Sequence, residues 1–221
     1  MLSDIRTTIF FTKMILLIIF IFLSAITYIV GDFLNKPLVK YFSKPITTIL
    51  IILLAVLQQV EVSETYKYLI IIALVFSLVG DVFLMLPTDK FIQGLISFLV
   101  AHIFYIVAFT LGFGPYFEFS LLVPAAIYAV IFLWILLPKT GKMKPAVIIY
   151  SLTLMVFLWQ ATGRFYYIAE TTALLTLFGA ILFIISDTIL AYSRFLKKYK
   201  FSQTLIHLTY WGAQVLLALS I

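Results

Sequence analysis

The sequence contains no cysteine and only two histidines, which removes several kinds of functional site at once. Without cysteine the chain has no disulfides, no thiolate nucleophile and no sulfur ligands for a metal. The two histidines, His102 and His207, are too few for a zinc site built from three histidines. We therefore expect neither a metal nor any other cofactor.

Charged residues are also scarce, at 11% of the 221 residues, whereas 64% of the residues are hydrophobic. A soluble domain typically carries about 25% charged residues, so this chain lacks the polar side chains that would cover a surface in water. Its mean hydropathy is +1.19. These values predict an all-α, polytopic membrane protein with a single membrane domain, residues 1–221. The net charge of +6 does not indicate nucleic-acid binding, because no basic arm or face is long enough.

Eight apolar segments approach the length of about 20 residues that a helix needs to cross a bilayer. They are 14–30, 45–60, 67–87, 91–112, 118–137, 145–160, 172–192 and 204–220. We expect the second and sixth helices to be short and to begin at Pro45 and Pro145, since proline at a first helical position loses no hydrogen bond. No small-x-small cleavage site follows the first segment, which favours a span over a signal peptide.

Basic residues are distributed unequally between the two sets of loops. Alternate loops carry eleven of them: Lys36, Lys40, Lys44, Lys90, Lys139, Lys142, Lys144, Arg194, Lys197, Lys198 and Lys200. The opposite side carries four: Arg6, Lys13, Lys67 and Arg164. The positive-inside rule therefore predicts that the eleven lie in the cytoplasm and that both termini lie outside. The composition and short loops suggest a bacterial inner membrane.

Three features recur in order at an offset of about a hundred residues. Lys44-Pro45 is matched by Lys144-Pro145, and Gly80-Asp81-x-x-Leu84 is matched by Ser186-Asp187-x-x-Leu190. A histidine follows each aspartate, after 21 residues in the first case and 20 in the second. This order predicts two four-helix halves, 1–112 and 118–221, in the same orientation. The alternative is a coincidence among common dipeptides.

Two carboxylates, Asp81 and Asp187, are the only charged residues that we place deep within predicted spans. A carboxylate at the bilayer centre costs about 2.5–3.5 kcal/mol on insertion scales, so such residues face the protein interior and mark a functional site by default. Both should lie about 10 Å from the cytoplasmic ends of equivalent helices and could face one cavity. Three interpretations stay open: a catalytic pair, a proton- or cation-coupled transport site, and structural bonding to neighbouring hydroxyls.

Other polar residues gather at matching levels in the predicted spans. The candidates for binding a substrate near the acids are Lys44, His102, Tyr105, Tyr150, Ser186, Tyr210 and Gln214. Each has an ordinary alternative role, because membrane tyrosines often anchor at the interface and a lysine near a helix end often extends its amine to the surface. Lys44 could also bind a lipid phosphate on the cytoplasmic side.

Several stretches together resemble the YhhN family, the lysoplasmalogenases. They are Ser77-Leu-Val-Gly-Asp-Val-Phe-Leu-Met-Leu-Pro87, Phe91-x-x-Gly94-x-x-x-Phe98-x-x-Ala101-His102-x-x-Tyr105, Lys44-Pro45-Ile-Thr47, Ile185-Ser186-Asp187-x-x-Leu190-Ala191-x-x-x-Phe195 and Tyr210-x-x-Ala213-Gln214. The resemblance covers nearly the whole chain except the N-terminal 30 residues and the outside loops.

The resemblance implies an eight-helix enzyme that cleaves the vinyl ether bond of a single-chain ether phospholipid, with Asp81 and Asp187 as catalytic residues. Its products would be a fatty aldehyde and a glycerophosphoethanolamine or glycerophosphocholine. Vinyl ethers hydrolyse through carbon protonation to an oxocarbenium ion, and paired carboxylates serve a similar cation in glycosidases. A small transporter and a structural or lipid-binding protein are the competing classes.

Overall fold

The computed structural model describes residues 2–111 and 114–221, and the chain within them is helical with no strand. The helices are α1 (Leu2–Phe33), α2 (Pro37–Leu57), α3 (Glu64–Met85), α4 (Phe91–Phe109), α5 (Phe119–Leu136), α6 (Lys144–Ile168), α7 (Thr171–Phe195) and α8 (Ser202–Leu219). Two short 3-10 turns, Leu137–Lys139 and Gly141–Met143, connect α5 to α6. The prediction of an eight-helix bundle is confirmed.

Seven of the described helices, all except α8, are long and apolar enough to cross a membrane. Large apolar side chains on the outside of the bundle, such as Trp134 at 78% exposed, would face lipid. The eighth helix is less apolar because it carries buried polar residues, including His207 and Gln214, and it packs mainly against α7 and α2. The protein is therefore an integral, multi-pass membrane protein.

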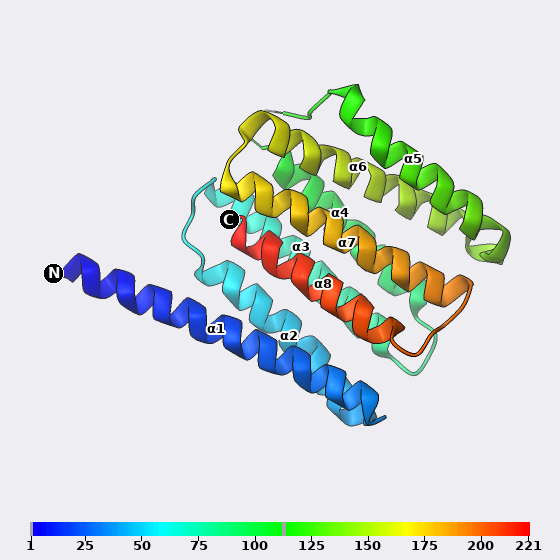
Figure 1. Ribbon diagram of the computed structural model, residues 1–221, viewed down its shortest axis with the longest axis horizontal. Helices are drawn as coiled ribbons and strands as arrows, with labels where there is room; N and C mark the ends of the chain where they lie inside the picture. Colours follow the sequence, from blue (N-terminus) through cyan, green and yellow to red (C-terminus); the bar gives the residue numbers. More distant parts are fainter. Residues whose placement is uncertain (1, 112–113) are drawn as a thin grey trace.

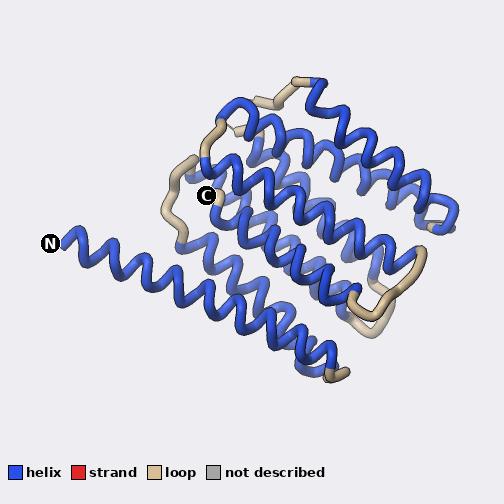
Figure 2. The backbone as a smooth tube through the Cα atoms, in the orientation of Figure 1, coloured by secondary structure: helices blue, strands red, loops and turns tan. Residues whose placement is uncertain are grey.

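Successive helices run antiparallel, so that α3 and α7 point in the same direction (Figure 1). The connections α1–α2, α3–α4, α5–α6 and α7–α8 lie at one end of the bundle, which we call the loop end (Figure 2). Both chain termini lie at the opposite end, which we call the terminal end. The predicted basic loops thus share the loop end, and their cytoplasmic location stays a prediction.

The start of the second helix was predicted wrongly. It begins at Pro37 and continues through Pro45, which therefore lies inside α2. An internal proline removes one backbone hydrogen bond, but hydroxyl groups on either side of it bond to carbonyls one turn earlier: Ser43 to Val39 and Thr47 to Ser43. Such side chains compensate for proline in membrane helices, and the helix continues without a break.

Two basic residues that were predicted to lie in loops are instead buried inside helices. Lys44 is 7% exposed within α2, and Arg164 is 2% exposed within α6. The Arg164 guanidinium lies 4.7 Å from the centre of the Tyr66 ring, an arrangement that stabilises a buried cation. Lys44 and Lys144 are consequently not equivalent, because Lys144 is the exposed first residue of α6. The two-half organisation stays a prediction.

Close contact between α3 and α4 depends on two glycines. A Cβ at Gly80 would lie 2.7 Å from the Phe98 ring, and one at Gly94 would lie 2.7 Å from the Leu84 side chain. Small residues let membrane helices approach closely. Gly80 therefore positions α3, and with it the neighbouring Asp81, against α4.

We expect Gly80→Ala to lower the free energy of unfolding by about 1–3 kcal/mol, the usual cost of overpacking. Gly212→Ala is the matched control, because its Cβ would meet only the flexible end of Leu182 at 3.3 Å. Thermal unfolding in detergent measures the stability of both variants. Alanine raises helix propensity in each of them, so this gain cancels in the comparison. Equal thermal stability of the two variants would contradict the packing role of Gly80.

Candidate functional site

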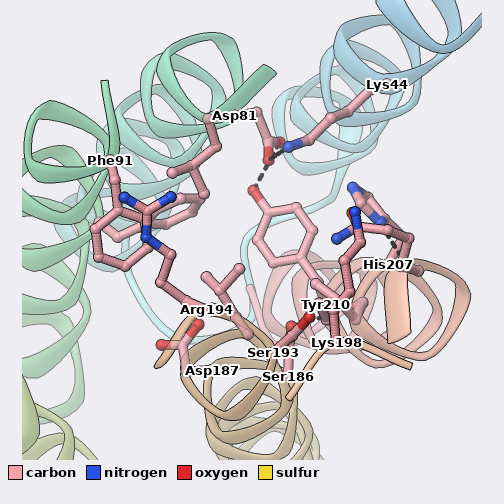
Figure 3. Close-up of a pocket in the computed structure, with 15 residues that line it drawn as sticks. Lys44, Asp81, Phe91, Ser186, Asp187, Ser193, Arg194, Lys198, His207 and Tyr210 are labelled. Carbon is pink, nitrogen blue, oxygen red and sulfur yellow. Dashed lines mark hydrogen bonds and ion pairs between the residues drawn. The ribbon is translucent and has the colours of Figure 1, made fainter. Parts of the chain in front are cut away.

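A cavity of about 400 Å³ lies between α2, α3, α4, α7 and α8, toward the loop end (Figure 3). We call it the acid cavity, because Asp81 and Asp187 both lie on its wall. Its lining residues are Lys44, Asp81, Leu84, Phe91, Phe98, Ser186, Asp187, Leu190, Ser193, Arg194, Lys198, Gln203, Ile206, His207 and Tyr210. Two carboxyl groups 106 positions apart in sequence thus share one chamber.

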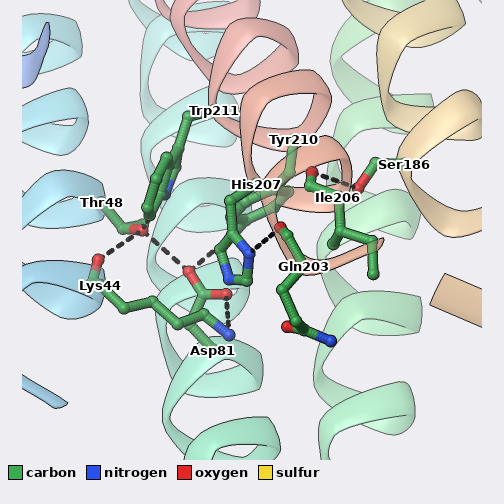
Figure 4. Close-up of polar contacts among 9 residues, drawn as sticks. All are labelled: Lys44, Thr48, Asp81, Ser186, Gln203, Ile206, His207, Tyr210 and Trp211. Atoms are coloured by element: carbon green, nitrogen blue, oxygen red, sulfur yellow. Dashed lines mark hydrogen bonds and ion pairs between the residues drawn. The ribbon is translucent and has the colours of Figure 1, made fainter. Parts of the chain in front are cut away.

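Asp81 is held by a cation and two hydroxyl donors from neighbouring helices (Figure 4). Its Oδ1 lies 3.1 Å from Lys44 Nζ, and its Oδ2 accepts hydrogen bonds from Thr48 Oγ1 at 2.8 Å and Tyr210 OH at 2.9 Å. The carboxyl is 2% exposed. A buried charge is tolerated when it is paired and hydrogen-bonded, and the Asp81 carboxyl group has partners of both kinds.

Asp187 has a different environment on the other side of the cavity (Figure 3). Its Oδ2 accepts a hydrogen bond of 2.6 Å from Tyr150 OH, and the residue is 8% exposed. Among the described residues, no basic side chain forms an ion pair with it. Burial without a nearby cation favours the neutral carboxylic acid.

The rim of the acid cavity is basic and carries one ion pair. Arg194 Nη2 donates a hydrogen bond of 2.6 Å to Asp89 in the α3–α4 connection, and the guanidinium lies 4.7 Å from the centre of the Phe91 ring. The Arg194 hydrogen bond lowers the pKa of the exposed Asp89 carboxyl below its usual value. Lys198, in the connection between α7 and α8, is exposed beside the same opening.

Two further spaces adjoin the acid cavity and differ in polarity. One, of about 350 Å³, lies toward α1 and shares Lys44, Leu84, Lys198, Gln203 and His207 with it. The other is a narrow space of about 30 Å³ between α4, α5, α6 and α7, which we call the apolar slot. The slot shares Phe91, Asp187 and Leu190 with the acid cavity, and its other lining residues include Leu95, Val147 and Leu154. Asp187 therefore lies where a polar chamber meets an apolar one.

The structure brings some of the predicted site residues together and separates others. Lys44, Ser186 and Tyr210 line the acid cavity, and Tyr150 borders the apolar slot while bonding to Asp187. The remaining three, His102, Tyr105 and Gln214, do not line the acid cavity.

These three residues belong to the helix packing deeper in the bundle. The His102 ring is fully buried and lies against Phe157 and Phe183, with centroids 4.8 and 4.5 Å away, and its Nδ1 is 2.7 Å from the Phe98 carbonyl oxygen. Tyr105 OH donates a hydrogen bond of 2.6 Å to Gln214 Oε1, which joins α4 to α8.

Three functional candidates were missed or underrated in the sequence. Thr48 follows Lys44 by four residues and therefore shares its helix face, a signal that was available once α2 was placed correctly. His207 lines the acid cavity while its ring lies 4.2 Å from that of Tyr28. Lys198 lies in a loop, where no periodicity identifies it.

Within residues 2–111 and 114–221, no three acidic or histidine side chains cluster as a metal site would require.

We expect Lys44→Met to destabilise the protein by about 3–5 kcal/mol, because it leaves a buried carboxylate without its cation. The double variant Lys44→Met with Asp81→Asn should recover much of this loss. Lys40→Met is the control, since Lys40 pairs with Asp32 where the side chains are 33% and 18% exposed, and such pairs contribute about 0–1 kcal/mol. Thermal unfolding in detergent gives the values. A double variant no more stable than Lys44→Met would contradict the pairing.

Comparison with known proteins identifies relatives over most of the chain. Lysoplasmalogenase TMEM86B of Sus scrofa is 32% identical over 170 residues, which are 76% of this chain and 70% of that protein. Lysoplasmalogenase TMEM86A of Homo sapiens is 34% identical over 155 residues, 68% of this chain and 64% of that protein, so the match spans just under two thirds of its length. An uncharacterized membrane protein YhhN of Escherichia coli O157:H7 is 21% identical, with 82% of this chain and 86% of that protein covered. No solved structure matches. The YhhN family profile matches residues 39–221, and the chain belongs to the YhhN family.

Proposed function

We propose that the protein is a membrane hydrolase that cleaves the vinyl ether bond of lysoplasmalogens. Relatives that are named lysoplasmalogenases support this reaction. The observation that carries the proposal is the position of Asp187, at the junction of a polar cavity that also contains Asp81 and an apolar slot. A single-chain ether lipid has the same sequence of polar head, reactive bond and apolar chain.

The first chemical step is protonation of the vinyl ether carbon that is β to oxygen, and Asp187 is the proposed donor. This step requires a carboxylic acid that is neutral before it reacts. Asp187 is buried and has no ion pair with any described basic side chain, and both features favour that form. Tyr150, which donates a hydrogen bond to Oδ2, fixes the orientation of the carboxyl group. The remaining oxygen is then directed at the substrate.

Asp81 supplies the negative charge that the resulting oxocarbenium ion needs. Its ion pair with Lys44 and its two hydroxyl donors hold this carboxyl group across the cavity from Asp187. Water adds to the cation and transfers its proton to a carboxylate, and the hemiacetal collapses to a fatty aldehyde and a glycerophospho-ethanolamine or glycerophosphocholine. Two carboxyl groups in unlike environments divide acid and base roles in this way in other hydrolases.

The remaining predicted residues divide between the cavity and its support. We assign Ser186 and Tyr210 to the cavity wall, where the hydroxyl of Ser186 bonds to the Ile206 carbonyl at 3.0 Å. His102, Tyr105 and Gln214 act through packing and contact no substrate in this scheme.

The alternative function, transport, requires an aqueous path that runs past Asp81 and Asp187 to the opposite side of the membrane. Beyond Phe98 and Tyr210, toward the terminal end, the described side chains pack as an aromatic cluster that includes Phe157, Phe183 and Phe109. These rings are fully buried. A chamber that ends at such a cluster favours a reaction site over a passage. We also propose that the protein lies in a bacterial inner membrane and that its loop end faces the cytoplasm.

We expect Asp187→Asn and Asp81→Asn each to lower kcat at least 100-fold, in the range of 10²–10⁴ that positioned acids and bases contribute. Glu64→Gln, in the first turn of α3 at the terminal end, is the control and should retain full activity. The assay measures free aldehyde from a lysoplasmalogen with purified, folded protein. Near-full turnover by either aspartate variant would refute the acid-pair mechanism.

Carbon protonation also predicts where solvent hydrogen appears. When the reaction is run in D₂O, the released aldehyde should carry one deuterium on the carbon next to the carbonyl, as measured by mass spectrometry of the trapped product. An authentic aldehyde incubated under the same conditions controls for exchange by enolisation. An aldehyde without deuterium would exclude protonation of the vinyl carbon by an exchangeable acid.

A further inference from the structure

The second polar space, beside α1, has a composition that the cleavage reaction does not explain. We call it the α1 pocket; its volume is about 350 Å³. Besides the residues that it shares with the acid cavity, it is lined by Tyr28 and Asp32 of α1 and by Lys40 and Tyr41 of α2. It therefore contains a carboxylate, an amine and two aromatic rings next to the proposed reaction site.

Besides Lys44, which pairs with Asp81, the charged side chains of the α1 pocket are one weak ion pair and Lys198. Lys40 Nζ lies 2.9 Å from Asp32 Oδ1, and the two side chains are 33% and 18% exposed. A partly exposed pair of this kind contributes about 0–1 kcal/mol, so its members can exchange partners at little cost. Lys198, which lies at the boundary with the acid cavity, has no ion pair with any described residue.

This arrangement is complementary to a group that carries both charges. A phosphodiester bound by Lys198 and Lys40 would release the Asp32 carboxylate, and an ammonium group bound to Asp32 would replace Lys40. The rings of Tyr28 and Tyr41 line the same pocket and attract a primary or quaternary ammonium through cation–π interactions. A purely anionic group would leave Asp32 facing it without compensation.

The depth of the pocket agrees with this occupant. Asp32 lies in the last turn of α1 at the loop end, whereas Asp187 lies eight residues, or about 12 Å, before the end of α7. The headgroup of a lipid stays near the membrane surface, and the ether bond lies deeper, toward the chain. The α1 pocket adjoins the acid cavity, and the acid cavity in turn adjoins the apolar slot.

We propose that the α1 pocket is the binding site for a zwitterionic phospho-amine headgroup, with Asp32 recognising the ammonium and Lys198 the phosphate. This inference rests on the proposed function, and it adds a selectivity that the two catalytic aspartates do not provide. Asp32 is in this scheme a specificity residue and takes no part in the chemical step.

The test compares three alkenyl lysolipids with the same chain: a phosphocholine, a phosphoethanolamine and a phosphate monoester that has no amine. We expect Asp32→Asn to lower kcat/KM about tenfold for the two amine-containing substrates, as the loss of one charge-assisted contact predicts, and less than twofold for the phosphate monoester. Lys198→Met should lower kcat/KM for all three, whereas Glu64→Gln should change none. Asp32→Glu should restore most of the selectivity.

A soluble ligand distinguishes headgroup recognition from binding of free phosphate. Glycerophosphocholine should inhibit the wild-type protein more strongly than Asp32→Asn, whereas inorganic phosphate should inhibit Asp32→Asn at least as strongly as the wild-type protein, because the variant removes the carboxylate that faces the anion. If the wild-type protein cleaves lysoplasmalogens but Asp32→Asn affects all three lipids equally, or none of them, the ammonium site is refuted and the proposed function stands. If the wild-type protein releases no aldehyde from any lysolipid, the proposed function itself fails.

Discussion

The ion pair between Lys44 and Asp81 is the interaction on which the site depends. A carboxylate that is 2% exposed inside a lipid-embedded bundle needs charge compensation and hydrogen-bond donors. Lys44 and Thr48 of α2 and Tyr210 of α8 supply them, so one side chain of α3 ties three helices together. The same requirement explains the composition of α8. That helix carries polar residues into the interior, and among the described helices it alone is not long and apolar enough to count as a candidate span.

The two aspartates are the same residue type in two different environments. Asp81 has a cation and two hydroxyl donors, whereas Asp187 has one hydroxyl donor and borders an apolar slot. In the proposed mechanism the first aspartate acts as the carboxylate and the second as the carboxylic acid. Under the proposed mechanism, the different neighbours of the two carboxyl groups therefore assign the acid role to Asp187 and the base role to Asp81.

Hydropathy predicted the bundle because lipid-facing segments must be apolar, and scarcity of charge within spans identified Asp81 and Asp187. The buried position of Lys44 was missed, since Pro45 was interpreted as a helix start and lysines at helix ends usually reach the surface. His102 was placed in the site on spacing alone, but spacing along a helix does not fix which neighbouring helix its face meets. The contribution of Lys198 depends on the path of a loop, and a single sequence carries no periodic signal for it.

Under the proposed function, the arrangement of the three spaces also favours a single-chain lipid over a two-chain one. Under the proposed function, the glycerol of a substrate whose ether bond reaches Asp187 would lie in the acid cavity, and its one chain would point toward the apolar slot. A second acyl chain on that glycerol would lie among Lys44, Asp81 and Lys198. Leaving an apolar chain against charged groups forfeits about 0.8 kcal/mol for each methylene that is not buried and displaces water from the ion pair. Under the proposed function, the polarity of the cavity wall would favour lysolipids without any steric gate.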